Sequence, residues 1–142
     1  MSGKDYPRRA LSHDNYQTDD WILSMIGRNY FDPCPLNEAP LQDGLQLDWV
    51  EESKGYFNIF INPPYSNPKA WIIKAIETSK SIDLDIAIIL LLKHDSSTEW
   101  YRLLHEAGAK FLLVNGRLKH QTARGAAFPS LIAVLNQERP PR

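Results

Sequence analysis

Residues 57–65 read Phe57-Asn58-Ile59-Phe60-Ile61-Asn62-Pro63-Pro64-Tyr65, a short apolar run that leads directly into two prolines. Near-continuous apolar residues over this length are typical of a buried strand. The prolines lack N–H donors and fix φ, so the strand must end here in a stiff turn. The sequence therefore predicts a strand over 57–61 whose carboxyl end carries an amide, rigid carbonyls and an aromatic ring.

The turn from Asn62 to Tyr65 suits a small planar group that carries an exocyclic amine. Its acceptor oxygens can take N–H protons while the Tyr65 ring stacks on the face of that group. Asn-Pro and Pro-Pro are also common loop dipeptides, so an ordinary turn is the alternative interpretation. Position favours a binding site, because ligands of open α/β sheets bind at the carboxyl ends of strands.

Helices and strands alternate along the chain on both sides of this turn. Apolar spacing predicts helices over 18–28, from Asn67 onward and over 96–108. Strands are expected over 30–31, 45–50, 57–61, 86–92, 111–114 and 131–135. This order predicts an α/β fold with a mostly parallel sheet and an antiparallel strand at one edge.

Local signals predict how the helices begin and which faces they bury. Trp21, Ile22, Met25 and Ile26 form an apolar stripe on the first helix. Asn67 before Pro68 is a good start for the second helix, and 96–99 have the form of a capping box for the third. Helical spacing makes Trp71 and Trp100 core residues more readily than stacking platforms.

Length and composition predict one globular domain over 1–142, with irregular ends over 1–16 and 137–142. Hydrophobic residues make up 43% and charged residues 23% of the chain, as in soluble proteins. No apolar run approaches the roughly 18 residues of a membrane span, and no signal-peptide pattern is present. Cys34 is the single cysteine, so we expect no internal disulfide and a cytoplasmic location. Scattered His residues and one Cys predict no metal site.

The charge balance neither indicates nor excludes nucleic-acid binding. The formal net charge is −1, from 16 basic and 17 acidic residues. Basic residues gather toward the C-terminal part of the chain, and binding needs a local basic patch rather than a basic total. The long polar loop over 115–130 carries several of them, and loops of this length are commonly functional or disordered.

Several stretches in this order resemble the phage-type, Dam-like family of DNA N6-adenine methyltransferases. The matching stretches are Phe31-Asp32-Pro33-Cys34-Pro35-Leu36-Asn37, Gly44-Leu45, Asp48-Trp49, Asn62-Pro63-Pro64-Tyr65, Leu90-Leu91-Leu92, Trp100 and Gly116-Arg117-Leu118-Lys119. The resemblance covers about 18–135. It implies a Rossmann-like class I methyltransferase fold, S-adenosylmethionine as the cofactor and adenine in DNA as the substrate.

The resemblance also implies roles for the proline turn. The Asn62 side-chain oxygen and the Pro63 carbonyl accept hydrogen bonds from the adenine amine, Pro64 shapes the turn, and Tyr65 stacks on the base. A base inside a duplex cannot reach such a pocket, so the adenine would be flipped out. No strong general base is required, because the proton can leave after the nitrogen becomes positively charged.

Five residues are candidates for holding the cofactor: Thr18, Asp32, Pro33, Cys34 and Asp48. By the resemblance, Asp32 meets the cofactor's amino group beside a wall formed by Pro33 and Cys34. Asp48 could bond ribose hydroxyls, as an acidic residue past a strand does in dinucleotide folds. The plainer alternatives are a turn start at Asp32, a solvated acid at Asp48 and a helix cap at Thr18.

Four basic residues are candidates for contacts with DNA phosphates: Lys93, Arg117, Lys119 and Arg124. Lys93 follows the central strand, and the other three lie on the long loop. An ordinary solvated loop is the alternative interpretation.

The sequence departs from the family in ways that affect the cofactor side most. No glycine-rich turn follows the first strand, and the spacing from Asp32 to Asn62 is too short for two full βα units. The sheet should therefore be abbreviated. Asp19 and His120 also replace the proline and the aromatic residue of the family pattern. Sequence specificity would come from loops or a homo-oligomer, or be low. RNA or a protein glutamine as substrate, or a degenerate, non-enzymatic DNA-binding or assembly subunit, are the alternatives.

Overall fold

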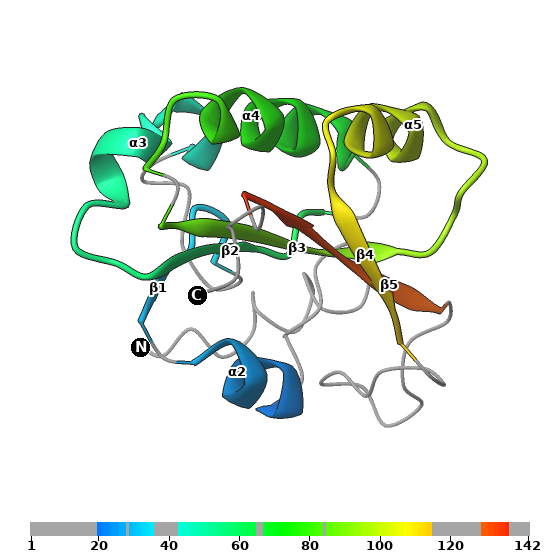
Figure 1. Cartoon of the computed structure of the whole chain (residues 1–142), viewed down its shortest axis with the longest axis horizontal. Helices are drawn as coiled ribbons and strands as arrows, with labels where there is room; N and C mark the ends of the chain where they lie inside the picture. Colours follow the sequence, from blue (N-terminus) through cyan, green and yellow to red (C-terminus); the bar gives the residue numbers. More distant parts are fainter. Residues whose placement is uncertain are drawn as a thin grey trace.

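The computed structural model of the chain describes residues 20–27, 29–35, 43–64, 67–83, 85–114 and 129–136. These residues form one five-stranded sheet with helices on both faces (Figure 1). The helices are α2 (Asp20–Ile26), η1 (Gly44–Gln46, a 3-10 helix), α3 (Trp49–Glu52), α4 (Lys69–Ser79) and α5 (Glu99–Glu106). The strands are β1 (Tyr30–Phe31), β2 (Asn58–Ile61), β3 (Ala87–Lys93), β4 (Lys110–Leu113) and β5 (Ser130–Leu135).

The strands lie in the order β1-β2-β3-β5-β4. β1, β2 and β3 are parallel, and β5 runs antiparallel to both of its neighbours, β3 and β4. The expected mixture of strand directions is confirmed, and the last two strands form an antiparallel pair at one side of the sheet. The strand that runs against all the others, β5, is internal, so the expected antiparallel edge strand was wrong. Burial explains the order, because every residue of β5 is buried, whereas Leu112 and Leu113 of β4 are exposed.

Alternation along the strands divides the core into two layers. α3, α4 and α5 cover one face of the sheet, and α2 covers the other (Figure 1). The larger core, on the α4 side, includes Ile59, Ile61, Ile72, Leu90, Leu92, Leu104, Leu131 and Ala133. The smaller core, on the α2 side, consists of Ile22, Phe60, Ala87, Leu91, Ile132 and Val134. The sheet is thus buried on both faces, as its apolar strands predict.

Only half of the apolar stripe predicted for the first helix is buried. Ile22 of α2 is fully buried and Ile26 is partly buried. Trp21 and Met25 remain 49% and 57% exposed. Both pairs follow i, i+4 spacing, and a short helix on this sheet buries only one of them.

The strand expected over 45–50 is absent, and the prediction was wrong. Gly44–Gln46 form η1, and Trp49–Glu52 form α3. Trp49 is 1% exposed, stacks on Trp71 and donates a hydrogen bond from Nε1 to the Gly44 carbonyl over 2.8 Å. Burial of one large side chain, together with side-chain caps at Asp43 and Asp48, stabilises helical turns where a simple alternation suggested a strand.

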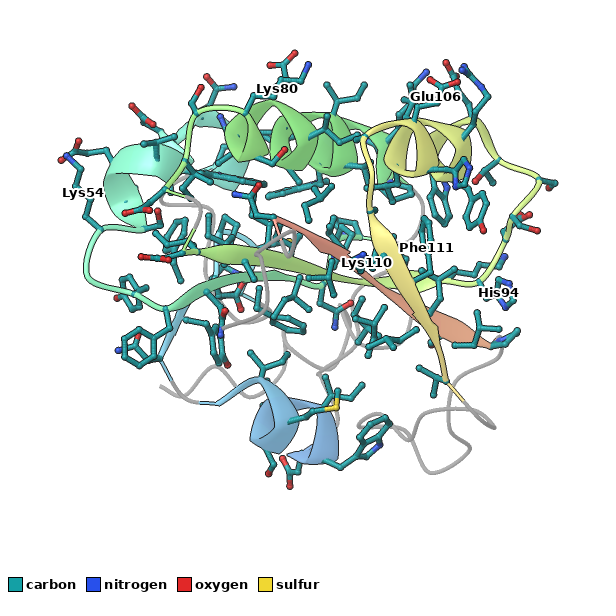
Figure 2. All side chains as sticks on the ribbon, in the orientation of Figure 1. Lys54, Lys80, His94, Glu106, Lys110 and Phe111 are labelled. Carbon is teal, nitrogen blue, oxygen red and sulfur yellow. The ribbon has the colours of Figure 1, made fainter. Side chains whose placement is uncertain are left out.

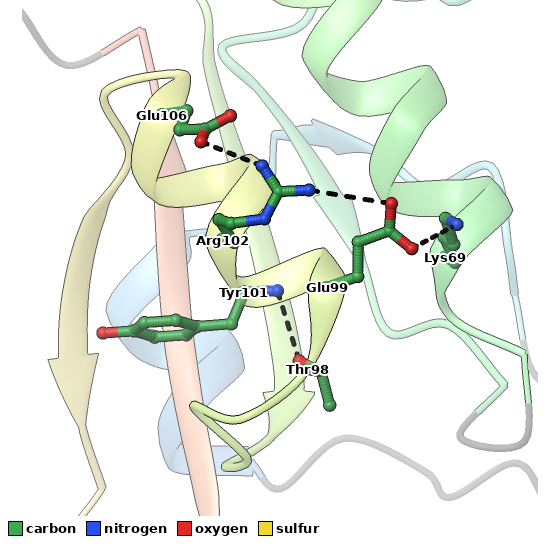
Figure 3. Close-up of polar contacts among 6 residues, drawn as sticks. All are labelled: Lys69, Thr98, Glu99, Tyr101, Arg102 and Glu106. Carbon is green, nitrogen blue, oxygen red and sulfur yellow. Dashed lines mark hydrogen bonds and ion pairs between the residues drawn. The ribbon is translucent and has the colours of Figure 1, made fainter.

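The two long helices begin at different residues from those expected. α4 begins after Pro68, which makes no side-chain cap, so the predicted Asn67 cap was wrong. α5 is capped by Thr98, whose Oγ1 accepts from the Tyr101 N–H at 3.2 Å, and not by a capping box from Ser96 (Figure 3). Gly108 ends α5 with φ of +85°, a conformation that favours glycine. Trp71 and Trp100 are both 8% exposed, which confirms them as core residues.

Across the described ranges, no helix has the length and apolar character that a membrane span requires.

Candidate functional site at the carboxyl edge of the sheet

The carboxyl ends of β1, β2 and β3 meet at one edge of the sheet. Asp32 follows β1, Asn62 follows β2, and His94 follows β3. The antiparallel β5 starts at this same edge, where the His94 N–H donates to the Pro129 carbonyl over 2.9 Å. Figure 2 shows His94 at this edge and Lys54 at the opposite end of the sheet. The structure thus gathers residues from distant parts of the chain at the edge where the sequence predicts a site.

The proline turn lies at the end of β2, the second of the three parallel strands. Pro63 is buried, and Pro64 is partly buried. The Asn67 N–H donates to the Pro64 carbonyl over 3.2 Å, which closes the turn before α4 begins. The side-chain oxygen of Asn62 is buried, while the residue as a whole is partly exposed. Two fixed φ angles and this closure hold the backbone of the turn in one place.

Strand alternation puts several polar side chains on the α2 side of this edge. Lys93 and Ser130 are direct partners across β3 and β5, and both alternate with residues of the larger core. Asn62 and Asp32 each follow a residue that packs in or against the larger core, so the same alternation turns them toward α2. An amide, a carboxylate, an ammonium group and a hydroxyl therefore share one side of the sheet edge. Lys93 is exposed, whereas Ser130 is 1% exposed.

Asp32 begins a tight turn at the end of β1. Its Oδ1 accepts a hydrogen bond from the Cys34 N–H at 2.8 Å. Pro33 is buried, and its carbonyl lies against Gly44, where an added Cβ would overlap the oxygen. Cys34 is partly buried and packs against the larger core. Asp32 and the two residues predicted to form a wall beside it, Pro33 and Cys34, therefore lie in one turn that packs against η1.

Asp48 lies away from the other predicted cofactor residues. Its Oδ1 caps α3 by accepting from the Val50 and Glu51 N–H groups at 3.1 Å and 3.3 Å. α3 covers the face of the sheet opposite α2 (Figure 1). The structure does not bring Asp48 and Asp32 to the same side.

A cavity of about 760 Å³ runs between α2 and β1. In the described part of the chain it is lined by Asp20, Leu23, Ser24, Gly27 and Tyr30. The lining mixes a carboxylate, a hydroxyl and a phenol with apolar surface, and the volume falls in the usual range of sites for small molecules and cofactors. Asp20 lies at the start of α2, so one end of the cavity is acidic.

Asp95 organises the loop that follows β3 and was missed by sequence reasoning. Its Oδ1 accepts from the Ser97 hydroxyl at 2.6 Å and from the Ser97 N–H at 3.1 Å. These two hydrogen bonds, aided by the nearby charge of Lys93, hold the pKa of the Asp95 carboxyl below its ordinary value. The carboxylate stays ionised beside two basic residues, Lys93 and His94. An Asp two residues before Ser is the signal that could have identified this turn.

Five predicted site residues lie outside the described residues: Thr18, Tyr65, Arg117, Lys119 and Arg124. Among the residues that are described, no three His, Cys, Asp or Glu side chains gather closely enough to hold a metal ion.

Comparison with known proteins identifies the family. The profile of the family described as DNA N-6-adenine-methyltransferase (Dam) matches residues 9–130. A protein of Haemophilus phage HP1 (strain HP1c1), named DNA N-6-adenine-methyltransferase, is 37% identical over 63 residues, which are 44% of this chain and 32% of the phage protein. The aligned stretch thus spans about a third of the length of that relative. No solved structure matches the chain significantly. Because the family profile extends over most of the sequence, this chain belongs to the DNA N-6-adenine-methyltransferase (Dam) family.

Proposed function

We propose that this protein transfers a methyl group from S-adenosylmethionine to the N6 amine of adenine in DNA. Family membership supports a DNA adenine methyltransferase. The observation that carries the proposal is the position of Asn62-Pro63-Pro64. This rigid turn follows a buried parallel strand and lies between the ends of β1 and β3.

The chemistry needs acceptors for an amine more than it needs a strong base. The N6 lone pair is delocalised into the adenine ring, and hydrogen bonds from N6 to two acceptors would localise it toward the incoming methyl. The side-chain oxygen of Asn62 and the carbonyl of Pro63 are the two acceptors in this proposal. Both belong to a turn that two prolines hold still, so little reorganisation is needed when the base arrives.

When bound, S-adenosylmethionine would supply a methyl group on a sulfonium, and the acceptors at Asn62 and Pro63 would hold N6 with its lone pair directed at that methyl group. The positively charged N6 then loses a proton to water. Tyr65 would hold the adenine ring by stacking, which fixes the angle of the amine to the two acceptors. The reaction therefore requires the protein only to align N6 with the methyl group and to accept hydrogen bonds from N6.

The residues beside β1 fit such a cofactor. The cavity between α2 and β1 has about 760 Å³ and carries the Asp20 carboxylate, which suits the hydroxyl and amino groups of a nucleoside. Asp32 at the end of β1 faces the same side, with Pro33 and Cys34 next to it. We propose that Thr18, Asp32, Pro33 and Cys34 hold the cofactor there. Asp48 caps α3 on the opposite face of the sheet, so its proposed contact is with the ribose hydroxyls alone.

We propose that four basic residues contact the DNA. Lys93 is exposed at the end of β3, and Arg117, Lys119 and Arg124 belong to the segment that follows β4. Phosphate contacts from these residues would position the duplex without reading its sequence. The adenine would leave the helix stack to reach the turn at Asn62.

The fold agrees with this role. We propose an abbreviated Rossmann-like class I methyltransferase domain that occupies the whole chain and acts in the cytoplasm, or in the host cytoplasm if the protein is viral. The support is the five-stranded sheet with three parallel strands and one internal antiparallel strand.

One observation favours a second candidate, a non-enzymatic DNA-binding or assembly subunit. Both carboxylates predicted for the cofactor, Asp32 and Asp48, already accept hydrogen bonds from backbone N–H groups. Calorimetry separates the two candidates, because the enzyme must bind S-adenosylmethionine and the subunit need not. If titration with S-adenosylmethionine gives no binding heat, either with the purified chain alone or with the chain bound to DNA, the non-enzymatic subunit is favoured.

The substrate class is tested by methyl transfer from labelled cofactor to unmethylated DNA, to RNA and to protein, in parallel reactions. We expect label in DNA alone. Label in RNA or in a protein glutamine, with none in DNA, would contradict the proposal.

A further inference from the structure

Trp21 differs from the other three tryptophans of the chain. Its side chain is 49% exposed, whereas Trp49, Trp71 and Trp100 are 1%, 8% and 8% exposed. Met25, one helical turn later, is 57% exposed and extends the apolar surface along α2. A large aromatic surface left in water next to a second apolar side chain is characteristic of a contact site.

The direction of α2 puts Trp21 close to the site. The last turn of α2 lies beside the start of β2, since the Asn58 side chain donates from Nδ2 to the Ile26 carbonyl over 3.3 Å. The helix therefore runs opposite to the parallel strands. From Ile26 back to Trp21 the helix rises about 7.5 Å, whereas the strand rises about 13 Å from Asn58 to Asn62, so Trp21 lies alongside the second half of β2, about 6 Å short of Asn62. Helical side chains tilt toward the N-terminus, so the indole extends toward the carboxyl edge.

Trp21 also lies on the flank of α2 that faces away from the cavity. Asp20, Leu23, Ser24 and Gly27 line the cavity beside β1 and follow the i, i+3, i+4, i+7 spacing of one helix face. Trp21 and Met25 form a separate stripe on the opposite flank. In the sheet order, that flank looks toward β3 and β5, where Lys93 lies at the carboxyl edge.

We propose that Trp21 stacks on a nucleobase of the bound DNA, beside the adenine that enters the turn at Asn62. This inference rests on the proposed DNA substrate and names the contact that steadies it. An indole offers a large rigid face to any base, so the contact is tolerant of sequence. Lys93 on the same side supplies the positive charge that a nucleic-acid strand needs. The cofactor is the less suitable partner, because its cavity lies on the other flank.

Tryptophan fluorescence of the full chain reports on this contact directly. Since the other three indoles are buried, a neutral quencher such as acrylamide should act mainly on Trp21. We expect a short duplex with an unmethylated adenine to protect the fluorescence from acrylamide. S-adenosylmethionine alone should leave the quenching unchanged. Protection by the cofactor alone, without protection by DNA, would overturn the proposal in favour of a cofactor contact.

Variants give the second readout. Trp21→Ala should raise the Kd for the duplex about 5- to 150-fold, the range expected for loss of one base–aromatic stack. Trp21→Phe should keep most of the affinity, and Met25→Ala, one turn farther from the edge, should change the Kd little. The unfolding temperature of Trp21→Ala should stay near that of the wild type, because half of the indole is exposed. An unchanged Kd in Trp21→Ala, or a change only in oligomeric state by light scattering, would refute the stacking role.

The two proposals fail in different ways. If the wild-type chain binds and methylates DNA while Trp21→Ala binds equally well, only the stacking inference fails. If neither the wild-type chain nor Trp21→Ala methylates DNA, but Trp21→Ala still binds DNA more weakly than the wild type, the proposed reaction fails and the stacking contact stands.

Discussion

Gly44 packs directly against the carbonyl of Pro33, so closely that a Cβ at residue 44 would overlap the oxygen. The same Cβ would also come within 3.0 Å of the Trp71 ring. The Gly44 carbonyl in turn accepts the hydrogen bond from Trp49 Nε1 at 2.8 Å. The turn that follows β1 is therefore fixed from the outside by η1, and the position of Asp32 depends on a residue with no side chain.

Gly44→Ala should destabilise the protein by about 3 kcal/mol, the upper part of the range for an overpacked core, because backbone must move on one side or the other. Urea unfolding followed by circular dichroism measures this change. Gln46→Ala on the same 3-10 helix is exposed and is the matched control, with a change expected within about 0.5 kcal/mol. Equal midpoints for Gly44→Ala and the control would show that the contact is absent.

The Lys69–Glu99 ion pair joins the first turns of α4 and α5 at 2.7 Å, and Arg102 adds a second cation on α5 (Figure 3). The hydrogen bond and charge of Lys69 hold the pKa of Glu99 below its ordinary value of 4.5. A lowered carboxyl pKa stabilises the fold above 4.5 and loses that effect as the pH falls through the folded-state value. Both partners are about half exposed, so the effect should be small.

Glu99→Gln should therefore lower the Tm slightly at pH 7 and low salt, and this difference from the wild type should shrink at a second pH chosen well below 4.5. Thermal unfolding at the two pH values tests the sign. Glu52→Gln, an exposed position on α3, is the matched control against which the Glu99→Gln difference is compared. A gap that grew at acid pH would mean that the pKa of Glu99 is not lowered by folding.

Arg117 and Lys119 should contribute to DNA affinity through phosphates. The double variant Arg117→Ala/Lys119→Ala should weaken binding at every sequence and reduce the slope of log K against log salt by about 2. Binding measured at several salt concentrations gives this slope. Lys80→Ala, exposed at the end of α4, should leave it unchanged. A slope equal to that of the wild type would remove these two residues from the interface.

Long apolar runs and glycine stops were enough to predict most of the fold. β2, β3 and β5 each bury nearly every residue, so their sequences show little besides apolar side chains. What the sequence could not show was the order of the last two strands. Both are short and apolar, and only the exposure of Leu112 and Leu113 in the folded sheet distinguishes the edge strand from the internal one.

The site was predictable where the chain itself is rigid. The prolines after Asn62 fix the turn locally, so its position at a strand end follows from the residues alone. The role of Asp48 was harder to predict. Asp48 caps α3 because Trp49 is buried against Trp71, and that contact joins segments that are distant in the sequence. Ser130 was missed because its place beside Lys93 depends on pairing between β3 and β5.

Nucleoside analysis by mass spectrometry of unmethylated DNA, after incubation with S-adenosylmethionine and either the wild-type chain or Asn62→Ala, tests the central claim most directly. We predict N6-methyladenine with the wild-type chain. Its initial rate of formation should be at least 100-fold lower with Asn62→Ala, about the loss expected for one preorganised hydrogen-bond partner of a reacting group. Equal circular dichroism spectra would show that the variant is folded. Full methylation by Asn62→Ala, or methylation of any atom other than N6 by the wild type, would contradict the account.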